Sequence, residues 1–148
     1  MADLDPKALA LEALTGMLRD GRDLGYMEDA LPALTAFLSE VAAPDFVCVM
    51  VGAPPVVGTT YPGVEGLGNA WRDWGEAFET VRAELEEVRE SEDHIVLMVK
   101  QIATTHRDGV EITQPSAMVF RFADGRLTRL ELHLDRDAAL RAAGLSSG

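Results

Sequence analysis

The stretch "VEITQPSAMVFRFADGRLTRLELHLD", residues 110–135, decides the fold because it reads as two β-strands joined by a tight turn. Apolar and polar residues alternate in its first part, and the "ADG" in its middle is a hairpin signal. Since successive side chains of a strand point to opposite faces, the alternation defines a core face for residues 110–122. The predicted core face consists of Val110, Ile112, Gln114, Ser116, Met118, Phe120 and Phe122.

The last strand, predicted for residues 126–135, has one apolar and one polar face. Leu130, Leu132 and Leu134 share the apolar face. His133 lies on the opposite, outer face with Arg129 and Glu131. We expect a structural or surface role for this histidine, with catalysis as the alternative.

Upstream, residues 81–89 and 94–105 also read as strands, and the second of these is apolar on both faces. A sheet with water on one side should not carry two apolar faces. Something therefore covers the outer face, and a second subunit is the simplest cover. The apolar residues are Ile95, Leu97 and Val99 on one face, and Val96, Met98 and Ile102 on the other.

The N-terminal half favours helices at residues 5–21, 28–41 and 64–78. Their apolar residues recur at helical spacing. In the first helix, Asp5 is placed to cap and Pro6 falls in the first turn, where its missing N–H costs nothing. One or two further helical turns are expected after residue 135.

A short apolar run at residues 46–51 predicts a buried strand, and residues 52–63, rich in Pro and Gly, predict a loop. The order helix, helix, strand, helix and four antiparallel strands indicates an α+β fold. We expect one strongly curved, mostly antiparallel sheet with the three helices of the N-terminal half on its concave face. With 148 residues, the chain suits a single domain, 1–148.

Composition limits the classes of partner and location. A net charge of −12 repels phosphate backbones, so we expect no nucleic-acid partner. No apolar run approaches the roughly 20 residues that span a bilayer, and the acidic N-terminus lacks a secretory h-region.

Cys48 is the single cysteine, which excludes an intrachain disulfide and favours a cytoplasmic protein. We read it as a small buried hydrophobe rather than a nucleophile. The histidines share no close spacing, so we expect no metal and no cofactor.

Three segments resemble the SnoaL-like group of the NTF2-like superfamily, whose members have a polyketide cyclase-like fold. They are "APDF" (residues 43–46), "YPGVEGL" (61–67) and "FADGRLTRLELHLDRDAALRAAGL" (122–145). The last is the most specific. The resemblance covers most of the chain from about residue 28, and the helix that precedes it looks longer than usual for the group.

The resemblance implies a cone-shaped cavity between sheet and helices, and frequent homodimers that pack sheet against sheet. Members of the group include cyclases, isomerases, epoxide hydrolases and proteins with no known reaction. The fold that the resemblance implies therefore does not by itself fix the function. In cyclase members, the polar residues for proton transfer fall on positions that match Met118 and Leu132 here. Neither side chain can move a proton, which argues against a cyclase mechanism.

The predicted interior is therefore apolar with a few hydrogen-bonding groups. The two tryptophans and Phe78 share one helical stripe, which favours core packing, with a pocket wall as the alternative. The candidate ligand-binding residues are Tyr61, Trp71, Trp74, Gln101, Gln114, Ser116, Met118, Phe120 and Leu132.

Three functions remain open at this point. The first is a homodimeric protein that binds a small hydrophobic molecule without the acid–base pair. The second is a cyclase- or isomerase-like enzyme that uses other polar groups, of which Asp45, Tyr61 and Gln114 would be tested first. The third is a dimeric accessory protein whose cavity is collapsed.

Overall fold

A computed structural model describes residues 8, 12, 23–51, 60–76 and 78–145. The helix predicted for residues 5–21 therefore lies almost entirely outside the described residues, and so does most of the loop predicted at 52–63. Both stay predictions, as does the extent of the domain.

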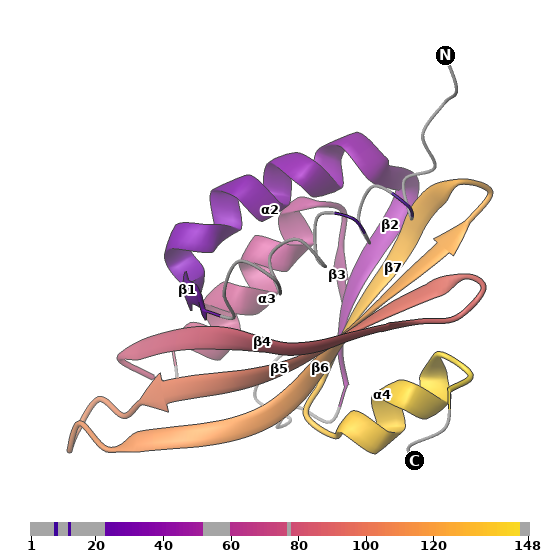
Figure 1. The fold of residues 1–148 in the computed structure, drawn as a ribbon. Coiled ribbons are helices and arrows are strands. Elements are labelled where there is room, and N and C mark those ends of the chain that lie inside the picture. The colour runs from indigo at the N-terminus through magenta and orange to yellow at the C-terminus, as the bar shows by residue number, and fades with distance from the viewer. Residues whose placement is uncertain (1–7, 9–11, 13–22, 52–59, 77, 146–148) are drawn as a thin grey trace.

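In the described residues, seven strands form one sheet, in which the C-terminal strands occupy the middle (Figure 1). The strand pairs are antiparallel except for β2 with β7, so the predicted α+β architecture is confirmed. In spatial order the strands are β1 (Asp23–Tyr26), β4 (Thr80–Glu90), β5 (His94–Thr104), β6 (Glu111–Ala123), β7 (Arg126–His133), β2 (Ala42–Val51) and β3 (Thr60–Pro62).

The β6–β7 hairpin forms as its sequence predicts. Asp124 and Gly125 both have positive φ angles, 52° and 76°, and they lie between the paired residues Ala123 and Arg126. Two successive positive φ angles define the tight turn whose twist matches that of the flanking strands. An aspartate followed by a glycine is one of the few residue pairs that adopts it readily.

Helices lie on both faces of the sheet (Figure 1). The helices α2 (Met27–Val41) and α3 (Glu65–Gly75) cover one face, which we call the concave face. The short helix α4 (Arg136–Ala142) lies against the opposite face, called the outer face. The prediction of helices on the concave face is thus confirmed for α2 and α3, while α4 forms a further layer.

The main core lies between the concave face and the two helices. Leu38 and Val41 of α2 are buried there, as the apolar stripe of this helix predicts. Phe46 and Cys48 enter from β2, and Leu67 enters from α3. Burial of such side chains stabilises the fold by about 1.5–3 kcal/mol each.

A second core explains the apolar outer face of β5. Val96 and Met98, together with Val119 of β6, pack against Leu140 and its neighbours in α4. The outer face is therefore covered from within the chain at this position. A homodimer through the outer face stays a prediction, but these residues no longer require one.

Several boundaries differ from the predictions. Thr60–Pro62 is a strand rather than a loop, because it pairs with β2. The segment Asp23–Tyr26 pairs with β4, where only a connection was expected. The helix α3 ends at Gly75, short of Phe78. The two additional strands share one cause, since pairing with a distant strand cannot be read from local composition.

The predicted core face of β6 is wrong at its N-terminal end. Val110 and Ile112 have the expected parity but are 53% and 43% exposed. From Ser116 onward the expectation holds, and Phe120 and Phe122 lie in the main core. Parity assigns a face, but only the extent of the helical layer decides where that face is covered.

Candidate functional site

The candidate site begins where the main core meets solvent. Met118 of β6 lies opposite Leu132 of β7, and both are only partly buried while they pack against the main core. Their neighbours on the same face are sealed, with Leu97 4% and Phe120 3% exposed. Met118 and Leu132 are thus less buried than the core residues beside them on this face.

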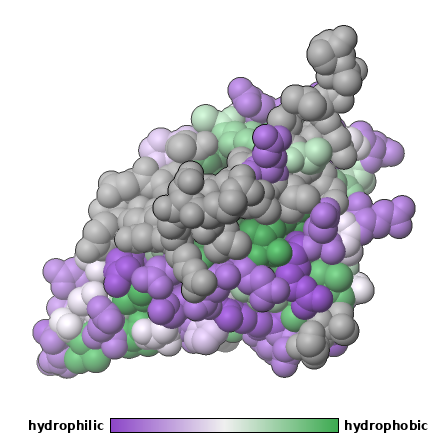
Figure 2. Space-filling view, in the orientation of Figure 1, coloured by the Kyte–Doolittle hydropathy of each residue, from purple (hydrophilic) through white to green (hydrophobic). Residues whose placement is uncertain are grey.

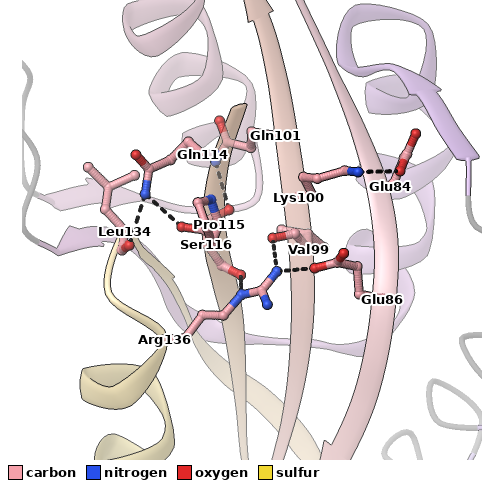
Figure 3. A network of polar contacts seen from close by, with 10 residues as sticks. All are labelled: Glu84, Glu86, Val99, Lys100, Gln101, Gln114, Pro115, Ser116, Leu134 and Arg136. Carbon is pink, nitrogen blue, oxygen red and sulfur yellow. Dashed lines mark hydrogen bonds and ion pairs between the residues drawn. The ribbon is translucent and has the colours of Figure 1, made fainter. Parts of the chain in front are cut away.

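A polar group follows on the same face, next to this apolar pair. Gln101 of β5 lies opposite Gln114 of β6, and its Nε2 donates a 3.0 Å hydrogen bond to Oγ of Ser116. Gln114 donates from Nε2 to the carbonyl oxygen of Leu134 at 3.2 Å (Figure 3). Ser116 is 2% exposed. A buried hydroxyl of this kind needs a partner, and the Gln101 amide supplies it.

Tyr61 and Asp73 form a contact that the sequence did not reveal. The hydroxyl of Tyr61 in β3 donates a 2.7 Å hydrogen bond to Oδ2 of Asp73 in α3. Tyr61 belongs to the main core and is 9% exposed. Asp73 lies between the two tryptophans in the sequence, and no motif distinguishes it from a surface carboxylate. The packing of α3 against β3 alone brings it to the tyrosine.

Of the predicted stripe of Trp71, Trp74 and Phe78, the structure describes the side chains of Trp71 and Phe78, and Phe78 lies beyond the end of α3. Trp71 and Phe78 are partly buried against a small cluster formed by Val81, Ala83 and Ala103. This contact supports the core-packing interpretation for Trp71. The side chain of Trp74 lies outside the described residues, so its predicted role as a pocket wall stays a prediction.

The remaining candidates for acid–base or nucleophilic chemistry lie elsewhere. Cys48 is fully buried, and burial raises the pKa of its thiol to about 12. It is therefore protonated at neutral pH and is not an activated nucleophile. Asp45 is exposed at the beginning of β2.

His133 lies on the outer face of the sheet, as predicted, and is only 4% exposed. Its Nε2 is 2.7 Å from Oε1 of Glu131, whose Oε2 accepts a 2.5 Å hydrogen bond from Nε of Arg129. Burial opposes ionisation of Glu131, but the bonds to His133 and Arg129 outweigh it and lower the pKa. His133 and Met118 point to opposite faces of the sheet, so this histidine is not a base for the concave face.

Two other kinds of site find no support in the described part of the chain. No group of three or more His, Cys, Asp or Glu side chains there could hold a metal ion. Among the described helices, none has the length and apolar character needed to cross a bilayer.

The comparison with protein families identifies the chain. Residues 32–130 match the model of the SnoaL-like domain, and the protein therefore belongs to this family. No curated protein matches the chain.

Solved structures share the fold. An NTF2-like protein of unknown function from Burkholderia pseudomallei is 25% identical with a TM-score of 0.58, over 79% of this chain and 87% of that one. TerC, co-crystallised with polyporic acid, is 20% identical with a TM-score of 0.54, over 74% and 84%. A putative SnoaL-like polyketide cyclase from Jannaschia sp. is 19% identical with a TM-score of 0.52, over 77% and 79%.

Proposed function

We propose that the protein binds a small, largely hydrophobic molecule on the concave face, at the opening beside Met118 and Leu132. The observation that carries the proposal is their partial exposure beside Leu97 and Phe120, which are buried on the same face. Apolar surface left open in a concave position is a common feature of ligand sites.

The polar residues next to the opening would give the ligand its orientation. Gln101 and Gln114 lie side by side there, and amide groups can both donate and accept hydrogen bonds. Ser116 holds the Gln101 side chain in place. We expect a molecule with an apolar body and at least one carbonyl or hydroxyl group.

Binding without catalysis is the form of the proposal that these residues favour. Neither Met118 nor Leu132 can donate or accept a proton, and Cys48 is protonated in the core. TerC has the same fold and was co-crystallised with polyporic acid, which is consistent with a small-molecule role for such a fold but assigns no ligand to this chain.

A cyclase- or isomerase-like enzyme is the second candidate, and the Tyr61–Asp73 contact favours it. A carboxylate that accepts a hydrogen bond from a phenol is a pair able to hold and pass a proton. Tyr61 reaches this carboxylate from the main core. For this candidate, Tyr61→Phe and Asp73→Asn should abolish turnover of a bound ketone while leaving its binding intact.

Thermal denaturation with a panel of apolar ketones and aromatic compounds tests the proposal. A ligand that binds the native state raises the melting temperature, by an amount that grows with its concentration. Met118→Trp should fill the opening and remove the shift. Glu87→Trp, at an exposed position of β4 on the outer face, should leave the shift unchanged.

Two results would count against binding at this site. One is the absence of any shift across a broad panel, which would favour an accessory protein with a collapsed cavity. The other is a shift that persists in Met118→Trp, which would place the ligand elsewhere.

A further inference from the structure

The strand β6 has an open edge at its N-terminal end. Its pairing with β7 starts only at Ala117, opposite His133, so residues 111–116 extend beyond the end of β7. On their other side the same residues pair with β5. In the described part of the chain, no strand pairs with this edge. Figure 1 shows the β5–β6 hairpin projecting beyond the helices at this end.

The ladder between β5 and β6 decides which backbone groups face the open edge. The N–H of Thr105 donates to the carbonyl of Val110 at 3.0 Å, so Val110 directs its backbone toward β5. Along an antiparallel strand pair, residues whose backbone N–H and C=O groups face the partner strand alternate with residues whose groups face away from it. Ile112 and Gln114 therefore also face β5, while the backbone groups of Glu111 and Thr113 point to the open edge.

The position of Pro115 is consistent with this alternation. It lies opposite Lys100 and belongs with the residues whose backbone points away from β5. A proline has no N–H to donate, so it is tolerated in a strand where that group would face an open edge. Pro115 also limits how far along the edge another strand can pair, because it offers no N–H donor to that strand.

Hydrophobic side chains accompany the open edge. Val110 and Ile112 are the large hydrophobic residues that are exposed among those the structure describes. Figure 2 shows hydrophobic surface at the lower left, at the end of the β5–β6 hairpin. Open backbone groups and apolar side chains together make an edge that another strand can extend.

We propose that this edge pairs with the same edge of a second copy of the chain, antiparallel and with the two-fold axis at Ile112. In this register Glu111 lies opposite Thr113 of the second copy, and the two residues exchange backbone hydrogen bonds. The two Ile112 side chains then meet across the axis. A two-fold contact of this kind is self-complementary, because each strand supplies the groups that the other lacks.

The neighbouring two-fold registers are disfavoured for separate reasons. An axis at Thr113 places Pro115 opposite Glu111 of the second copy, so the Glu111 carbonyl finds no N–H donor. An axis at Glu111 places the two glutamates directly opposite each other, and like charges in such pairs are destabilising. The axis at Ile112 avoids both costs.

The proposed contact differs from a dimer through the outer face, and it must form despite the charge of the chain. Each copy carries a net charge of −12, so two copies repel each other. Salt screens this repulsion, with a Debye length of about 10 Å at 0.1 M. The dimer should therefore become tighter as the salt concentration rises.

A cysteine cross-link tests the register. In Ile112→Cys the two Cα atoms would lie about 4.5 Å apart, within the range of a disulfide. In Val110→Cys the two cysteines would be offset by four residues, about 14 Å, and should not bond. Mild oxidation should therefore give a covalent dimer with Ile112→Cys alone. The wild type is the control, since its Cys48 is buried.

Sedimentation velocity across a protein dilution series tests the interface itself. Ile112→Lys places two like charges on the axis and should weaken the dimer about tenfold or more, while Ile112→Thr, which keeps a β-branched residue, should weaken it less. Val49→Lys on the outer face should have no effect on the edge contact. A wild type that is monomeric at all concentrations would overturn the proposal. A dimer that Val49→Lys disrupts and Ile112→Lys leaves intact would overturn it in favour of the outer face.

Discussion

Nη2 of Arg136, in α4, donates a 2.7 Å hydrogen bond to the carbonyl oxygen of Val99 in β5, 37 residues earlier in the chain. Nε of the same guanidinium donates to the carbonyl of Ser116 at 3.2 Å, and Nη2 also forms an ion pair with Glu86 (Figure 3). Glu86 is available because a register shift between Leu85 and Glu87 leaves it outside the β4–β5 ladder. One arginine thus ties α4 to three strands.

We expect Arg136→Ala to lower the free energy of unfolding by about 2 kcal/mol, because it removes several hydrogen bonds from a charged donor. The helix α4 has seven residues, too few to be stable without such contacts. Urea denaturation measures the change. Arg136→Lys should recover only part of the loss, since an ammonium cannot reproduce the planar fork of donors. Arg141→Ala, at an exposed position of the same helix, is the control. Equal losses from both arginines would contradict the anchoring role.

Two glycines of α3 should respond in opposite ways to the same substitution. A Cβ at Gly66 would lie 2.4 Å from the carbonyl oxygen of Tyr61, whereas a Cβ at Gly68 would meet nothing within 4 Å. Gly66→Ala should therefore force α3 away from β3 and destabilise the protein by about 2 kcal/mol. Gly68→Ala should stabilise it by about 0.5–1 kcal/mol, because alanine loses less entropy in a helix. Thermal unfolding of the two variants checks the pair, and stabilisation by both would show that α3 is not in close contact with β3.

The same charge placed on the two faces of the sheet should have unequal effects. Met98→Asp buries a carboxylate in the outer-face cluster, where Met98 is 5% exposed, and should cost about 3 kcal/mol or more. Met118→Asp places it at the opening on the concave face and should cost less than about half as much, because water reaches the carboxylate there. Chemical denaturation near neutral pH gives both values. A loss in Met118→Asp as large as in Met98→Asp would indicate a sealed core at residue 118.

Cys48 should make the stability depend on pH in the alkaline range. Burial raises its pKa from 9.0 to about 12, so the folded state retains the thiol proton after the unfolded state has lost it. The unfolded state then binds fewer protons, and the free energy of unfolding falls as the pH rises from about 9 toward 12. We expect the difference between wild type and Cys48→Ala to change by a few kcal/mol over this range. A difference that stays constant with pH would mean that the thiol is not shielded.

Reactivity provides an independent check on the same thiol. A disulfide reagent should react slowly with the native protein and at the rate of a free thiol in denaturant. Fast reaction without denaturant would contradict the buried position of Cys48.

The sequence by itself determined the local features of the fold. Alternation along β6 and β7 assigned Met118 and Leu132 to the helical side of the sheet, and the Asp124–Gly125 pair assigned the turn between the two strands. The apolar stripe of α2 was equally readable, and its Leu38 and Val41 are buried in the main core. The short helix expected after residue 135 also forms, and Asp135 caps it by accepting hydrogen bonds from the N–H groups of Asp137 and Ala138. Each signal depends on residues that are neighbours in the chain, so no tertiary information was needed.

Contacts between distant segments decided the rest. The tertiary structure covers Val96 and Met98 with α4, and leaves Ile112 exposed although its parity matches that of Phe120. It also brings Tyr61 to Asp73, which no motif announced. Side-chain periodicity states which residues share a face. Whether that face is buried depends on where the neighbouring elements end, and this is fixed only when helices and strands far apart in the sequence pack together.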